Sequence, residues 1–161
     1  MILGKKRIQE LIGHGLLENA EVECLGGAGY DLRLGKAYSL ETESFLGVSD
    51  RKTPKAKEIL VDPIHLKPGD YILVETMEKV NMPAGLAARV LNRSTVFRCG
   101  CSLFNALVDP GYKGTLTFGL KNLGERGFTV EKGARIAQIV FEEVDGETTE
   151  YNGKYQGGKV V

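Results

Sequence analysis

Apolar side chains near the N-terminus recur at the spacing of a helix. Four of them follow one another in three- or four-residue steps, namely Ile8, Leu11, Ile12 and Leu16. Lysine, arginine, glutamine and glutamate side chains fill the steps between them, so the apolar positions share one face. The pattern predicts an amphipathic helix over residues 4–17, within an N-terminal helical segment 1–17. Gly15 is a plausible stop signal, because glycine readily takes the left-handed conformation found after helix ends.

Beyond this segment the pattern changes to short apolar and β-branched runs separated by glycine and proline. Such runs predict strands. They cover residues 21–25, 30–34, 37–40, 71–77, 86–91, 115–121, 128–130 and 135–144. A helical turn or two is predicted only over residues 94–98, where Asn92 or Ser94 could cap its start. The fold is therefore predicted to be mainly β.

Two segments lack this pattern. Residues 49–58 contain an aspartate, an arginine, three lysines and a proline, and they are predicted to form a mobile loop. Residues 148–161 mix glycine with lysine and two tyrosines, and they are predicted to form a flexible C-terminal arm. The arm could order over a ligand, with an aromatic ring to stack on it, or dock on a neighbouring subunit, and its composition does not separate these alternatives.

Length and charge narrow the class of protein. A chain of 161 residues fits one domain that spans residues 1–161, and 21 basic residues balance 21 acidic ones. There is no net positive field to attract nucleic acid or an anionic membrane. The N-terminus lacks a signal peptide, and no apolar run reaches membrane-spanning length, so we expect a cytoplasmic protein.

The three cysteines, Cys24, Cys99 and Cys101, are predicted to be free thiols. Cys99 and Cys101 are separated by one glycine, which strains a direct disulfide. A zinc site usually shows two-residue spacing and nearby histidines, whereas His14 and His65 stand in unrelated segments.

A first candidate for chemistry is Asp109. It follows the apolar pair Leu107 and Val108 and precedes a strong turn signal, Pro110-Gly111, so its carboxylate is presented at the end of a strand. Tyr112 adds an aromatic ring three residues later. An acid held in this way on a β scaffold is typical of a functional site.

Other polar residues stand in unusual places. Asp31 is flanked by apolar residues and needs a partner, which could be Arg33 or a ligand. Arg93, followed by hydroxyl side chains at a possible helix start, favours a phosphate site. Gln138 is polar on an apolar strand face and demands a hydrogen-bond partner.

These segments gain specificity from their order. Five motifs follow one another: Ala28-Gly29-Tyr30-Asp31-Leu32, Arg93-Ser94-Thr95, Val108-Asp109-Pro110-Gly111-Tyr112-Lys113-Gly114, Gly133-Ala134-Arg135-Ile136-Ala137-Gln138, and Lys154-Tyr155-Gln156-Gly157. Together they resemble the dUTPase and dCTP deaminase superfamily over nearly the whole chain. The resemblance implies a distorted β-barrel or jelly-roll-like (β-clip) fold and a homotrimer with sites between subunits. It also implies a deoxyribonucleoside triphosphate substrate bound with Mg²⁺.

One position separates the activities of this superfamily. Its deaminases use a glutamate in the strand after the Asp-Pro-Gly turn, in a Thr-Leu-Glu-Leu-like context. The matching residue here is Gly119, which cannot move a proton. The zinc route to deamination also lacks its motifs, His-x-Glu and Pro-Cys-x-x-Cys. Glycine in mid-strand could mark a widened pyrimidine site or a bulge.

The sequence thus favours a dUTP diphosphatase, which would keep uracil out of DNA and supply dUMP for dTMP synthesis. The alternatives are a dCTP deaminase, a bifunctional enzyme, or a nucleotide-binding trimer without catalysis. The second motif reads Asn92-Arg93-Ser94-Thr95 instead of a Pro-Arg-Ser-Gly-like form, and the arm lacks Gly-Gly-Phe-Gly-Ser-Thr-Gly. In both respects the chain is similar to archaeal dUTPases of the deaminase-like branch.

The resemblance implies a role for each matching residue. Asp109 would activate the attacking water, Asp31 would help hold Mg²⁺ through waters, and Tyr112 would lie under the deoxyribose. Backbone groups from Asn105 to Val108 would bind uracil. The remaining substrate-binding positions are Arg93, Ser94, Thr95 and Gln138 at the phosphates, and Lys154, Tyr155 and Gln156 in the closing arm.

Overall fold

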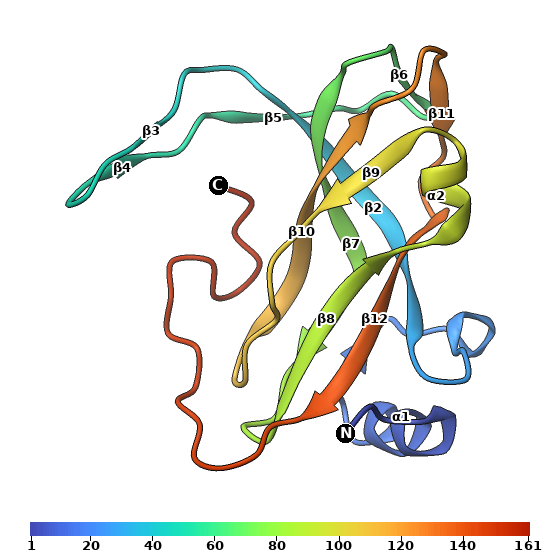
Figure 1. Cartoon of the computed structure of the whole chain (residues 1–161), viewed down its shortest axis with the longest axis vertical. Helices are drawn as coiled ribbons and strands as arrows, with labels where there is room; N and C mark the ends of the chain where they lie inside the picture. The colour runs from blue at the N-terminus through green and yellow to red at the C-terminus, as the bar shows by residue number, and fades with distance from the viewer.

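The computed structural model describes all 161 residues as one mainly β unit (Figure 1). The elements are α1 (Lys5–Gly13), β1 (Leu17–Glu18), the 3₁₀-helix η1 (Val22–Cys24), β2 (Tyr30–Leu40), β3 (Phe45–Leu46), β4 (Arg51–Lys52), β5 (Ala56–Glu58), β6 (Ile64–Leu66), β7 (Tyr71–Asn81), β8 (Leu86–Asn92), α2 (Ser94–Arg98), β9 (Cys101–Phe104), β10 (Lys113–Asn122), β11 (Phe128–Val130) and β12 (Arg135–Glu143). None of the helices has the length and apolar character needed to cross a membrane.

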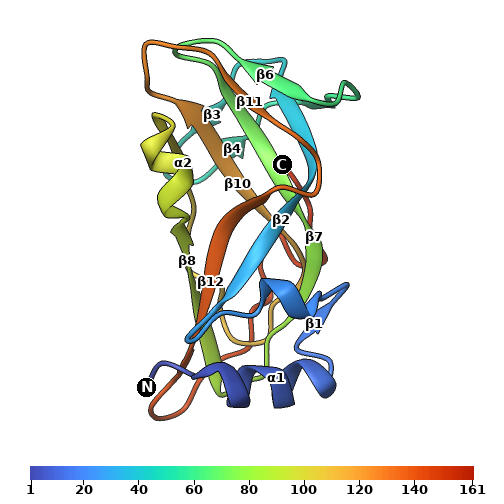
Figure 2. The ribbon, with the colours of Figure 1, turned by 90° about the vertical axis from the view of Figure 1, so that its right-hand side faces the viewer.

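The main sheet has the strand order β8-β12-β2-β7-β10-β9 and curves into a nearly closed barrel (Figure 2). Its two end strands, β8 and β9, are joined by α2 and by one side chain. The Asn92 carboxamide accepts a hydrogen bond from the Leu103 amide at 2.7 Å and donates one to the Ser102 hydroxyl at 3.4 Å. The expected mainly β, distorted-barrel fold is confirmed.

The N-terminal helix is shorter than expected. It runs over Lys5–Gly13 and buries Ile8, whereas residues 4–17 were predicted. Leu17 and Glu18 belong to β1, which pairs with β7. Gly15 has a φ of +91°, so it serves the turn between helix and strand as its residue type suggests.

Two further predictions were wrong in detail. Residues 21–25 form no strand but the 3₁₀-helix Val22–Cys24, because the chain reverses there and only Leu25 makes a β-bridge, to Tyr30. Residues 49–58 are not an unpaired loop. They contain β4, which forms the protruding hairpin with β3, and β5, which pairs with β2 (Figure 1). Backbone pairing needs no apolar side chains, so polar composition was a poor guide.

Strand β2 is continuous where two strands were expected. It passes through Gly35, beside a β-bulge in its pairing with β7. A Cβ atom built on Gly35 would lie 3.0 Å from backbone atoms of Thr76, so only glycine lets the two strands approach this closely.

Glu78 of β7 is the most completely buried acid in the chain. Its carboxylate accepts hydrogen bonds from the Arg33 amide at 3.0 Å, the Arg33 Nε at 2.7 Å and the Tyr30 hydroxyl at 3.3 Å. The Arg33 guanidinium also reaches the Asn19 carbonyl and Glu21. Burial raises the pKa of Tyr30, so this phenol is protonated and able to donate.

Replacing Glu78 by alanine is expected to lower the free energy of unfolding by about 3–5 kcal/mol, because Arg33 would lose its only buried acidic partner and keep only Glu21 and the Asn19 carbonyl. Urea denaturation followed by circular dichroism measures the change. The matched control is Glu58→Ala, which removes an exposed pair with Lys36 at 3.9 Å and should cost less than about 1 kcal/mol. Similar losses for both variants would contradict the assigned role of Glu78.

Candidate functional site

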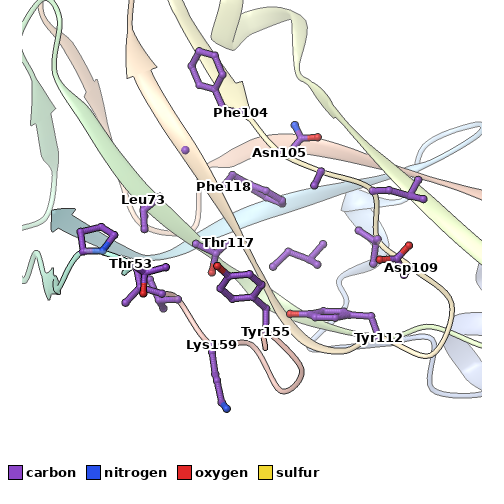
Figure 3. Close-up of a pocket in the computed structure, with 18 of the residues that line it drawn as sticks. Thr53, Leu73, Phe104, Asn105, Asp109, Tyr112, Thr117, Phe118, Tyr155 and Lys159 are labelled. Atoms are coloured by element: carbon purple, nitrogen blue, oxygen red, sulfur yellow. The ribbon is translucent and has the colours of Figure 1, made fainter. Parts of the chain in front are cut away.

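A cavity of about 620 Å³ opens between β10, the segment that leads from β9 into β10, and the C-terminal arm (Figure 3). Its wall is largely apolar. Asp109 has the only acidic side chain that lines it, and Lys159 has the only basic one. In Figure 3 the side chains of Asp109 and Tyr112 lie toward one end of the cavity and that of Phe104 lies at the other.

Asp109 is held at the start of a tight turn. Val108 before it forms a β-bridge with Ala88, and the Tyr112 amide donates to the Asp109 carbonyl at 3.2 Å. Gly111 within this turn has a φ of +77°, which few other residues adopt. The Asp109 carboxylate itself makes no hydrogen bond or ion pair within the chain, so it is available to a water or a ligand.

Tyr112 forms part of the cavity wall next to Asp109. Its hydroxyl donates to the Thr115 carbonyl at 2.5 Å, and its ring meets Tyr151 edge-on with centroids 5.6 Å apart. Burial, together with the neighbouring Tyr151 and Glu75, raises the pKa of Tyr112 to about 12. The phenol is therefore neutral, and its bonds fix the ring as a rigid surface.

The C-terminal arm packs on the chain's own cavity. Gln156 accepts from the Lys113 amide at 2.8 Å and donates to the Gly111 carbonyl at 3.0 Å, so it holds the backbone on both sides of Tyr112. Lys154 donates from Nζ to the Thr53 hydroxyl at 2.9 Å. Of the three arm residues expected at the site, only Tyr155 lines the cavity; Lys154 and Gln156 secure the arm.

A second polar cluster lies around Asp31. Its Oδ2 atom is 3.2 Å from Arg93 Nε and 3.7 Å from Arg135 Nη1. Arg93 also donates to the Arg135 carbonyl at 3.1 Å. The expectation that Arg33 could partner Asp31 was wrong, because the Arg33 guanidinium is already bound to Glu78.

The neighbours of this cluster also differ from expectation. Helix α2 begins without a side-chain cap, since Asn92 bonds to β9 and Ser94 makes no capping bond. Gln138 stands opposite Asp31 in the β2–β12 register. It finds no side-chain hydrogen-bond partner within the chain, and its partial exposure leaves its carboxamide to solvent or a ligand.

The structure separates the expected site residues into two groups within one chain. Asn105, Val108, Asp109, Tyr112 and Tyr155 line the cavity. Asp31, Arg93, Ser94, Thr95 and Gln138 do not, and α2 lies on the opposite side of the molecule from the arm in Figure 1.

The wall of the cavity contains two features that sequence reasoning missed. Gly119 pairs regularly with Leu73 and Phe104, and the bulge of β10 lies at Thr115–Thr117, so a bulge does not explain this glycine. A Cβ atom at Gly119 would instead collide with the Tyr71 phenol, 2.6 Å from Cζ. No local signal could have paired residues 71 and 119, because the contact depends on the alignment of β7 with β10.

The second missed feature is Thr117, a residue of the cavity wall whose hydroxyl oxygen is buried. It is the only buried side-chain polar atom in the chain without a hydrogen-bond partner. Buried hydroxyls are usually paired, so this one marks a place where a polar ligand atom would be favoured.

The cysteines and acids provide no metal cage. Cys24 and Cys101 are buried, Cys99 is exposed, and all three are free thiols, as expected. No group of three histidine, cysteine, aspartate or glutamate side chains is placed to hold an ion. Asp31 is a single carboxylate already paired with two arginines, so an ion near it would have to be held mainly by a ligand's phosphates and by water.

Comparisons with known proteins agree with this architecture. The family profile described as dCTP deaminase-like matches residues 2–144. A probable deoxyuridine 5′-triphosphate nucleotidohydrolase of Methanothermobacter thermautotrophicus is 38% identical over 135 residues, which cover 83% of this chain and 89% of that protein. A dUMP-forming dCTP deaminase of Aquifex aeolicus is 35% identical over 171 residues, covering 100% and 92%.

A solved structure shows the same fold. The 2′-deoxycytidine 5′-triphosphate deaminase of Agrobacterium tumefaciens superposes with a TM-score of 0.68 at 23% identity over 87% of this chain. The chain spans about half of that deaminase, since the match covers 47% of its length.

Replacing Gln156 by alanine is expected to loosen the arm, because three hydrogen bonds to residues 111, 113 and 151 are lost. Tryptic cleavage after Lys154 should become about fivefold faster for a net loss near 1 kcal/mol. Mass spectrometry of timed digests measures the rate. The control is Asn152→Ala, at an exposed arm residue without such bonds. Equal cleavage rates for both variants would contradict the role of Gln156 in holding the arm.

Proposed function

Because the chain belongs to the dCTP deaminase-like family, we propose that it is a dUTP diphosphatase, releasing dUMP and diphosphate from dUTP. The observation that carries the proposal is the single acidic side chain of the cavity, Asp109, at a wall that holds glycine where a deaminase needs an acid. Hydrolysis of a phosphoanhydride needs one group to orient and deprotonate water, and Asp109 can supply it.

Deamination needs more than the cavity offers. An acid–base group must activate water and protonate the leaving amine. Gly119 has no such group, and the Tyr71 phenol occupies the space beside it. The match to a dUMP-forming deaminase keeps deamination as the alternative, because that relative aligns with the entire chain.

The proposed division of labour follows the two groups of residues. Asp109 accepts the proton of a water that attacks the α-phosphorus in line with the departing diphosphate. The Tyr112 ring lies under the deoxyribose, where a ribose 2′-hydroxyl would clash. Backbone groups between Asn105 and Val108 pair with uracil, and cytosine would place donor against donor there.

The phosphates are proposed to contact the second group, which comprises Arg93, Ser94, Thr95 and Gln138. The guanidinium of Arg93 would offset negative charge on the triphosphate. Mg²⁺ would arrive with the substrate and neutralise the same charge, with Asp31 reaching it through water. Lys154, Tyr155 and Gln156 close the arm over the ligand.

This division requires a second chain. The residues proposed to bind the phosphates do not line the cavity of the same chain. A complete site would therefore combine the cavity of one subunit with the Asp31 cluster of another. A homotrimer with its sites between subunits satisfies this condition. The substrate would be dUTP, in a soluble cytoplasmic enzyme that does not bind nucleic acid.

The decisive measurement is a turnover assay with dUTP, dCTP and UTP in the presence of Mg²⁺. Diphosphate release from dUTP is expected, whereas dCTP and UTP should react poorly. Release of ammonia from dCTP at a comparable rate would establish the deaminase alternative. Binding of a dUTP analogue without any turnover of dUTP would establish a non-catalytic protein.

Asp109→Asn is expected to lower kcat for dUTP at least about a hundredfold, because the amide cannot accept the proton of the attacking water. Stopped assays of diphosphate release measure the rate. Asp145→Asn changes an exposed acid outside the cavity in the same way and should leave turnover intact. Full activity of Asp109→Asn would remove the assigned base.

Sites shared between subunits are tested by mixing two inactive variants. Asp109→Asn and Arg93→Ala, co-expressed with different tags, should form mixed oligomers that regain up to about a quarter of wild-type activity by random assortment. Each tag-purified parent alone supplies the control. If every site lay within one chain, the mixed oligomers would stay as inactive as their parents.

A further inference from the structure

Tyr71 and Gly119 form one side of the cavity, on neighbouring strands β7 and β10. Tyr71 is paired with Lys121, and its phenol lies diagonally over Gly119, two residues away on β10. Any side chain at residue 119 would displace the phenol. The ring also meets Phe104 of β9, with centroids 6.3 Å apart. Three strands thus contribute to one aromatic wall, and the Tyr71 hydroxyl is placed over a backbone that has no side chain.

This wall lies at the end of the cavity away from Asp109. The Tyr112 hydroxyl bonds to Thr115, whereas Gly119 is four residues further along β10, or about 13 Å at the rise of a strand. Figure 3 shows the same separation between Phe104 and the pair Asp109 and Tyr112. Between the two ends stands Thr117, whose buried hydroxyl has no hydrogen-bond partner within the chain.

A pyrimidine nucleotide placed with its phosphates near Asp109 would direct the far edge of its base toward this wall. The atom of a pyrimidine farthest from the sugar is the substituent on C4. We propose that Tyr71 is a base-recognition residue whose hydroxyl donates a hydrogen bond to the exocyclic oxygen on C4. The inference rests on the proposed function for the orientation of the substrate, and it adds the residue that contacts the distal edge.

The chemistry of Tyr71 suits this role. No group of the chain accepts a hydrogen bond from its hydroxyl. Partial burial raises the pKa of Tyr71, which is 40% exposed, and a phenol is in any case protonated and able to donate at neutral pH. Glycine at residue 119 is then required because any larger residue would displace the phenol. This requirement is separate from the fact that glycine cannot act as an acid.

The test compares two ligands that differ only at C4. One is α,β-imido-dUTP, which resists cleavage, and the other is its 2-pyrimidinone counterpart, which carries hydrogen in place of the oxygen. Calorimetry on the full chain measures both dissociation constants. Tyr71→Phe should weaken binding of α,β-imido-dUTP about tenfold and leave binding of the 2-pyrimidinone ligand unchanged.

Tyr38→Phe is the matched control, because it removes a phenol hydroxyl bound to Glu75 outside the cavity. It should change neither constant. Gly119→Ala displaces the phenol without removing it, so it should reproduce the selective loss seen in Tyr71→Phe. Equal losses for the two ligands would reduce Tyr71 to a packing residue, and no loss for either would overturn the proposal.

Failure of this inference is distinguishable from failure of the proposed function. Binding of these ligands requires no turnover, so the Tyr71 contact is measured even if the wild-type chain does not cleave dUTP. Conversely, normal cleavage of dUTP by Tyr71→Phe with unchanged affinity would refute the contact alone. A wild-type chain that binds neither ligand would overturn both.

Discussion

The buried carboxylate of Glu78 is the interaction on which the arrangement of β2 depends. Strand β2 pairs with β12 over its first residues and with β7 over its later ones. At the crossing Arg33 is still paired with Arg135 of β12, and its amide donates to the Glu78 side chain of β7. A buried amide without a partner would be costly, so this one acid permits a single strand to belong to both halves of the barrel. The position of Asp31, two residues earlier, follows from it.

Close approaches of backbone to neighbouring groups shape the rest of the site. Gly35 lets β2 and β7 meet at the bulge, and Gly119 admits a phenol from the next strand. Gly114 plays a similar part for the arm, since a Cβ atom there would lie 2.6 Å from the Gly157 carbonyl carbon. The shape of the site thus depends on glycines, where a side chain would collide with a neighbour, as well as on the side chains that line the cavity. Family membership and fold agree with this construction, and the proposed hydrolysis uses the one acid left in the wall.

The sequence predicted the parts of the structure that depend on local pattern. Alternation and turn residues located most long strands, and Pro110-Gly111 correctly predicted a turn after Asp109. The strand expected to end at Leu107-Val108 is absent, because β9 ends at Phe104 and only Val108 makes a β-bridge, to Ala88. Contacts between distant segments were beyond the reach of the sequence. Nothing near Arg33 indicates Glu78, nothing near Gly119 indicates Tyr71, and polar composition hid the backbone pairing of β5. Within one chain, the residues that motif order assigned to one site lie in two places, because motif order carries no information about distance.

The hydrogen bonds of Gln156 couple the docking of the C-terminal arm to the binding of a ligand. Gln156 grips the backbone at Gly111 and Lys113, the residues on either side of Tyr112. A ligand resting on Tyr112 beneath the arm therefore shares a thermodynamic cycle with arm docking. The free energy by which the docked arm strengthens ligand binding equals the free energy by which the bound ligand stabilises the docked arm. Substitutions at arm residues that do not line the cavity, such as Asn152, would in this way change the residence time of a ligand without altering a group that touches it.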